Sequence, residues 1–129
     1  MNLFLRISIV LTILTVFGAS ISGVLHQKAR QEKINKALIQ LTSKDQDERA
    51  NAINALTKLN AKETIPEITR LLQDNDSAVR RSATWALVRL DAKEAIPEIT
   101  KLLQDNDPKV RSAARAALKA LGVEVPAEK

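Results

Sequence analysis

Two Asp-Asn-Asp triplets, at residues 74–76 and 105–107, are the residues of this sequence best suited to binding a metal ion. Closely spaced carboxylates are typical of Ca²⁺ and Mg²⁺ loops, but these loops lack the Gly and the downstream Glu of an EF-hand. The second Asp of each triplet also stands where a following helix needs an N-cap. We therefore predict that Asp76 and Asp107 cap helices and that the triplets bind no metal.

The other residue types used in catalysis are scarce. The 129-residue chain has no Cys, which excludes disulfides, thiolate metal sites and cysteine nucleophiles. A single His26 leaves no imidazole cluster for zinc or iron. We expect one small domain that is not an enzyme and uses no cofactor.

Periodic arginines form the second charged set. Arg49, Arg80 and Arg111 recur every 31 residues. In stacked helices they would align, and each could bridge an Asp in the turn of its own or the adjacent unit. Such a row has little charge left for anion binding. The expected ladder and its caps comprise Asp45, Arg49, Asp76, Arg80, Asp107 and Arg111.

Trp85 is the one residue that the periodicity does not explain. Asn54 and Ala116 occupy the equivalent positions, so this position is not expected in the core. Arg81 and Arg89 lie four residues away on either side, on the same helix face. Trp flanked by Arg is typical of protein-binding hot spots, and an acidic helix or peptide would suit it. The alternative is that Trp85 only packs over the arginine stems or against a neighbouring unit.

The elements that position these residues are three repeated units, at residues 28–60, 61–91 and 92–122, followed by a tail at 123–129. The second and third units agree at 20 of 31 positions. Each unit predicts two antiparallel helices from its apolar spacing. Pro66 and Pro97 fall in the first turn of a helix, and Thr64 with Glu67 predicts a capping box. Gly122 is expected to end the last helix.

These motifs carry a family resemblance. An I-P-x-I-x-x-L-L helix followed by D-x-x-V-R-x-x-A-x-x-A-L-x-x-L resembles HEAT repeats, in particular the short HEAT-like repeats of the phycobilisome-lyase type. The resemblance covers residues 34–122. It implies an all-α short solenoid of three helical hairpins with the second helices on the concave face, and it implies a scaffold rather than one activity. Bilin lyases are much longer, and the iron-binding His-Glu pairs of deoxyhypusine hydroxylase are absent from this sequence.

The N-terminal segment, residues 1–27, has a different composition. Ile7 and Leu25 bound 19 uncharged residues, enough for about 28 Å of helix at 1.5 Å per residue. We expect a transmembrane helix before the solenoid; a cleaved signal peptide is the alternative. Lys28, Arg30 and the following lysines favour a cytoplasmic repeat domain by the positive-inside rule, but an exported domain stays open.

The functional hypothesis is a non-enzymatic, membrane-tethered scaffold that binds a protein. An accessory subunit of a lyase or maturation enzyme is the alternative. A third hypothesis is that the chain stacks on itself or on a longer HEAT partner, because Leu118 and Leu121 lie in the last helix with no further unit to cover them. Nucleic acid is disfavoured, since from Lys28 onward 19 basic residues are interleaved with 15 acidic ones and one Trp gives no stacking platform.

Overall fold

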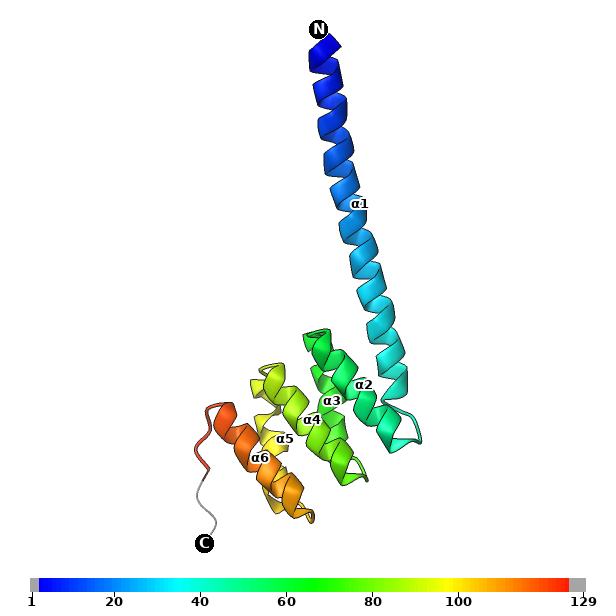
Figure 1. Ribbon diagram of the computed structural model, residues 1–129. Helices are drawn as coiled ribbons and strands as arrows, with labels where there is room; N and C mark the ends of the chain where they lie inside the picture. The colour runs from blue at the N-terminus through cyan, green and yellow to red at the C-terminus, as the bar shows by residue number, and fades with distance from the viewer. Residues whose placement is uncertain (1–2, 126–129) are drawn as a thin grey trace. The chain divides into compact units, whose positions relative to one another are not determined.

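A computed structural model describes the backbone of residues 3–125, and within this range all regular structure is helical (Figure 1). The chain divides into two compact units, Met1–Lys33 and Ile34–Lys129. The packed repeats therefore begin six residues after the boundary placed at residue 28 from the sequence.

Helix α1 (Leu3–Gln40) runs through both Gly18 and Gly23 without a break. Its apolar side chains that the structure describes between Ile7 and Leu25 are exposed, among them Leu14 at 63% and Phe17 at 67%. By length and composition it is the one helix in residues 3–125 that could cross a membrane, although a signal sequence would pass the same criteria. From Ile34 onward the helix belongs to the second unit, where Ile34 and Ala37 are buried.

The second unit contains a layer of three 13-residue helices: α2 (Gln46–Lys58), α4 (Ser77–Arg89) and α6 (Pro108–Ala120). Helix α4 packs against both α2 and α6 (Figure 1). Alanines such as Ala83 and Ala114 are fully buried on these helices, and their small side chains let neighbouring helices approach closely.

The first helix of each later unit is shorter than the sequence pattern predicts. Helix α3 (Ile65–Arg70) lies between the 3₁₀ turns η1 (Lys62–Thr64) and η2 (Leu71–Gln73). Helix α5 (Ile96–Lys101) lies between η3 (Lys93–Ala95) and η4 (Leu102–Gln104). Pro66 and Pro97 stand in the first turn of α3 and α5, where a missing amide donor costs no helical hydrogen bond.

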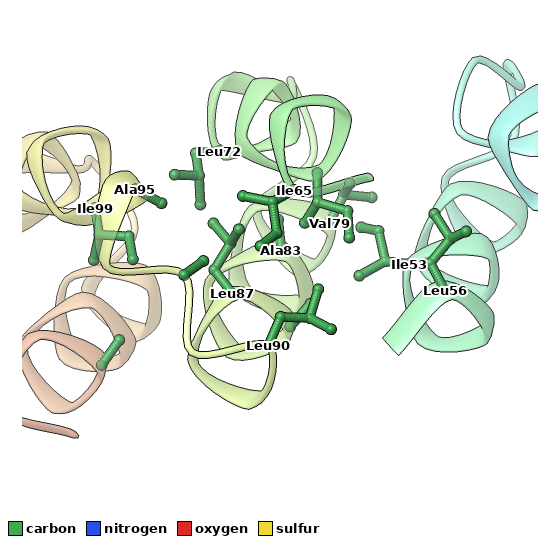
Figure 2. Packing of buried hydrophobic residues seen from close by; sticks show 14 of the residues in the cluster. Ile53, Leu56, Ile65, Leu72, Val79, Ala83, Leu87, Leu90, Ala95 and Ile99 are labelled. Carbon is green, nitrogen blue, oxygen red and sulfur yellow. The ribbon is translucent and has the colours of Figure 1, made fainter. Parts of the chain in front are cut away.

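One continuous hydrophobic core joins the repeats. Leu72, Leu87 and Ile99 come from three different elements and are fully buried in the same cluster (Figure 2). Burying a side chain of this size contributes about 1.5 to 3 kcal/mol. Each hairpin has a face that only its neighbour covers, so the units stabilise one another.

Two expectations about local structure are wrong. The Thr64 hydroxyl makes no capping bond to the helix and instead donates to the carbonyl oxygen of Ala61 at 2.7 Å. The 3₁₀ turn before α3 supplies that nearby carbonyl. Leu118 and Leu121 are buried, at 1% and 8% exposure, and Val123 and Val125 pack against the same core. The reason for expecting self-stacking through these leucines is therefore removed.

All three second helices end with a residue in the left-handed region. Asn60, Asp91 and Gly122 occupy equivalent positions, with φ of 48°, 54° and 88°. Only Gly adopts this conformation without a Cβ penalty.

We expect Asp91→Gly to stabilise the domain by about 0.5 to 1 kcal/mol, measured by urea unfolding. Gly122→Ala, with open space around the added Cβ, should lower the free energy of unfolding by a similar amount. If both variants are as stable as the parent chain, these left-handed positions carry no Cβ penalty.

Candidate functional site

The turn before each second helix is held by a capping aspartate. Asp45 accepts from the amides of Asp47 and Glu48, and Asp76 accepts from those of Ala78 and Val79. Asp107 accepts from the amide of Lys109. These bonds satisfy backbone donors that have no partner inside the helix.

Arg80 joins two adjacent turns. Its Nε donates to Oδ2 of Asp105 and its Nη2 to Oδ1 of the same carboxylate, both at 2.8 Å. Its Nη1 donates to the carbonyl oxygens of Asp74 and Asn75 at 2.8 and 3.2 Å. The side chains of this ion pair are only 11% and 7% exposed. A bidentate, buried pair of this kind fixes the spacing of two units.

Arg49 repeats the arrangement one unit earlier. Its Nε and Nη2 donate to the Asp74 carboxylate at 2.8 Å, and its Nη1 donates to the carbonyl oxygens of Ser43 and Lys44. Arg111 donates from Nη1 to the carbonyl oxygens of Asp105 and Asn106. Among residues 3–125 the structure shows no carboxylate bound to Arg111.

The ladder therefore uses Asp74 and Asp105, the first Asp of each triplet, whereas the caps use the second. The sequence predicts a role only for the second Asp of each triplet. It allows each arginine to pair with an Asp in the turn of its own unit or of the adjacent unit, and in the structure Arg49 and Arg80 pair with the following turn. Within the described residues, no group of three or more acidic or imidazole side chains is arranged to hold a metal ion.

The ladder shifts the acid–base properties of its members. Burial alone would raise the pKa of Asp74, but hydrogen bonds from the Arg49 guanidinium and from the Asp76 amide outweigh it and lower the pKa below its usual value. Burial would likewise raise the pKa of Asp105, but hydrogen bonds from Arg80 and from the Asp107 amide outweigh it and lower that pKa. The hydrogen bond to Asp74 raises the pKa of Arg49. Both pairs are therefore ionised at neutral pH.

These shifts predict acid sensitivity. A carboxylate with a lower pKa in the folded state contributes stability that is full above its unfolded pKa, near 4, and is lost as pH falls through the folded value. We expect the free energy of unfolding to decline from about pH 4 downward, measured by urea unfolding at several pH values. The decline should be smaller in Asp105→Asn, which cannot titrate; an unchanged decline in that variant would show that Asp105 is not responsible.

The structure places Trp85 at the surface of α4, with 42% of the residue exposed. Trp85 and Arg89 line a hollow of about 290 Å³ between α2 and α4. Asn54, Thr57 and Lys58 of α2 form the opposite wall. Arg81, the third residue of the predicted stripe, is half-buried and does not line this hollow. Of the three residues of the predicted stripe, Trp85 and Arg89 thus lie at this hollow and Arg81 lies outside it.

The two charged residues that line this hollow, Lys58 and Arg89, are both cations. Helices α4 and α6 carry seven Lys and Arg residues and no Asp or Glu: Arg80, Arg81, Arg89, Lys109, Arg111, Arg115 and Lys119. The acidic residues of residues 61–122 lie in the short first helices and in the turns. Since Arg80 is neutralised in its ion pair, the remaining cations give this layer a net positive surface.

Sequence reasoning missed the contribution of α2 to this site. Lys58 stands 31 residues before Arg89, and Asn54 stands 31 before Trp85. The repeat period thus contained the signal: equivalent positions on neighbouring second helices lie side by side. Lys58 extends the cationic rim of the hollow onto α2.

The fold and this surface define a helical repeat protein whose second helices form one packed layer. A family model described as HEAT repeats matches residues 34–119, two thirds of the chain. The chain belongs to the HEAT-repeat family, and this match does not extend to the narrower phycobilisome-lyase type. Comparison with curated proteins found no match. HEAT repeats generally mediate protein interactions.

Proposed function

We propose that this protein is a non-enzymatic, membrane-tethered interaction module that binds an acidic helix or peptide of a partner protein. The binding site is the hollow between α2 and α4, with Trp85 as its apolar anchor and Arg81, Arg89 and Lys58 as its charged surround. The observation that carries the proposal is an exposed Trp beside a hollow, on a layer whose two later helices have no acidic residue.

The chemistry of the site favours this partner. A half-exposed indole gains free energy when a partner covers its remaining apolar surface, and Trp is enriched among residues that dominate binding. Carboxylates along one face of a partner helix would meet the cations around Trp85 and speed association. Arg81 lies outside the hollow but one helical turn from Trp85, so it fits a partner that extends along α4.

Binding can be followed through Trp85, because it is the only Trp in the chain. The full-length chain in lipid nanodiscs is titrated with an amphipathic peptide that alternates Leu and Glu at helical spacing, and with its Leu-Lys counterpart. We expect a saturable blue shift of the emission with the Glu peptide alone, weakened at high salt. No shift with either peptide, or a shift with both, would contradict the proposal.

Support for the tether comes from α1, whose described apolar side chains between Ile7 and Leu25 are exposed. We expect the full-length chain to stay with membranes after alkaline carbonate washing and to run at its full size of 14.2 kDa. A variant lacking residues 1–27 should appear in the soluble fraction. A product shortened by about 20 residues and released from membranes would instead identify a signal peptide.

A further inference from the structure

Arg49 and Arg80, which each join two adjacent turns, use both edges of the guanidinium group. The inner edge, Nη1, donates to backbone carbonyls of the arginine's own turn. The outer edge, Nε and Nη2, holds the Asp of the next turn, and Nη2 also reaches the following Asn. For Arg80 these outer contacts are to Asp105 at 2.8 Å and Asn106 at 3.2 Å. An Asp-Asn turn is therefore the ligand that this outer edge binds.

Arg111 has the same inner contacts. Its Nη1 donates to the carbonyl oxygens of Asp105 and Asn106 at 2.8 and 3.3 Å. In the part of the chain that the structure describes, no side-chain oxygen accepts from its Nε or Nη2. The inner bonds hold the guanidinium in place, so its outer edge is oriented for a carboxylate, and no carboxylate of residues 3–125 occupies it.

A second observation concerns apolar side chains of the same unit. Ile65 and Leu72 are 6% and 0% exposed in the middle unit, whereas the equivalent Ile96 and Leu103 are only partly buried. Figure 2 shows Ala95 and Ile99 of the following unit on the side of Leu72. Leu103 thus keeps apolar surface at the position where Leu72 of the middle unit faces residues of the following unit, and Ile96 is less buried than Ile65.

We propose that Ile96, Leu103 and Arg111, here called the Arg111 edge, bind a helical hairpin of a different protein whose turn carries Asp-Asn. The carboxylate takes the outer edge of Arg111 as Asp105 takes that of Arg80, and apolar side chains of the hairpin cover Ile96 and Leu103. This edge uses none of the residues that line the Trp85 hollow, so it is a second binding surface, independent of the proposed function.

The chain's own turns exclude a second copy as the occupant. Its two Asp-Asn turns are already bound by Arg49 and Arg80. Its first turn has Ser43 and Lys44 at the positions of the Asp and the Asn. Lys44 would place a cation opposite Arg111, and Ser43 offers no carboxylate. None of these three turns supplies the Asp, and we assign it to another protein.

A site-specific cross-link tests this surface. A photo-crosslinking amino acid replaces the exposed Lys109 of the full-length chain in the cells that make it, and Asp47, the equivalent position of the first unit, serves as the control. We expect an adduct from position 109 to a peptide of another protein with an Asp-Asn pair directly before a helix. Arg111→Met and, separately, Leu103→Ser should each reduce its yield at least tenfold, while Trp85→Ala leaves it unchanged.

Three results would overturn the proposal. The first is a cross-link yield at position 109 no higher than at position 47. The others are an adduct to a second copy or to the same chain, and an unchanged cross-link yield in Arg111→Met. Thermal unfolding of Arg111→Met and Leu103→Ser shows whether each variant is folded. If one of them is unfolded, the other decides the question, because each removes a different contact of the same edge. The unchanged yield in Trp85→Ala separates this surface from the proposed function.

Discussion

Replacing Arg80 with Met is expected to destabilise the repeat domain by about 3 to 5 kcal/mol, the cost typical of breaking a buried ion pair by removing one partner. The substitution leaves the Asp105 carboxylate, 7% exposed, without its bidentate donor. It also removes the donor to the carbonyl oxygens of Asp74 and Asn75. Such a loss is a large share of the 5 to 15 kcal/mol that typically stabilises a domain. Urea unfolding of the full-length chain in detergent gives the difference.

Arg111→Met is the matched control, because Arg111 has the same inner contacts and holds no carboxylate among residues 3–125. It should cost no more than about 1 kcal/mol, the usual scale of a net hydrogen bond. Arg80→Lys keeps the charge but loses the bidentate geometry, and we expect an intermediate loss that can be measured if Arg80→Met does not fold. Equal losses for Arg80→Met and Arg111→Met would show that the ion pair contributes nothing beyond the carbonyl contacts.

Replacing Trp85 with Ala is expected to weaken binding of the acidic Leu-Glu peptide by about 30- to 1,000-fold, equivalent to 2 to 4 kcal/mol. The reason is that Trp85 supplies the large apolar side chain of the hollow, whereas its polar and charged neighbours lie in water before binding. Because 42% of Trp85 is exposed, the fold should lose little stability. Fluorescence anisotropy of a labelled peptide measures the affinity without the tryptophan signal.

Ile39→Ala provides the comparison for this prediction. Ile39 is also a large apolar residue at the surface of the repeat unit, with 75% exposed, and it does not line the hollow. The affinity of this variant should equal that of the parent chain. If Trp85→Ala and Ile39→Ala bind the peptide equally well, Trp85 packs over its neighbours without contributing to recognition.

Patterns of short range in the sequence predicted much of the fold. The second helices and their caps follow from apolar spacing and from Asp45, Asp76 and Asp107, because a cap and its amide partners lie within three residues of each other. The 31-residue period predicted the three units, and the resemblance of their helix motifs to HEAT repeats agrees with the family match at residues 34–119.

Features that depend on packing between units could not be predicted in the same way. Arg49 and Asp74 are 25 residues apart, and only the stacking distance decides which Asp of a triplet faces the arginine. The packing of Val123 and Val125 against the core depends on where the chain turns after Gly122. The hollow between α2 and α4 likewise needs two helices in place before Lys58 is seen beside Trp85.

The central claim is that the surface around Trp85 contacts an acidic segment of a partner protein, and an in-cell cross-link tests it most directly. An aromatic photo-crosslinking residue replaces Trp85 in the full-length chain, with the same residue at Ile39 as the control. The adduct at position 85 is then digested and its partner peptide sequenced. We predict a peptide rich in Asp and Glu that is absent from the position 39 sample. A position 85 sample with no adduct beyond that control, or with a basic peptide, would contradict the claim.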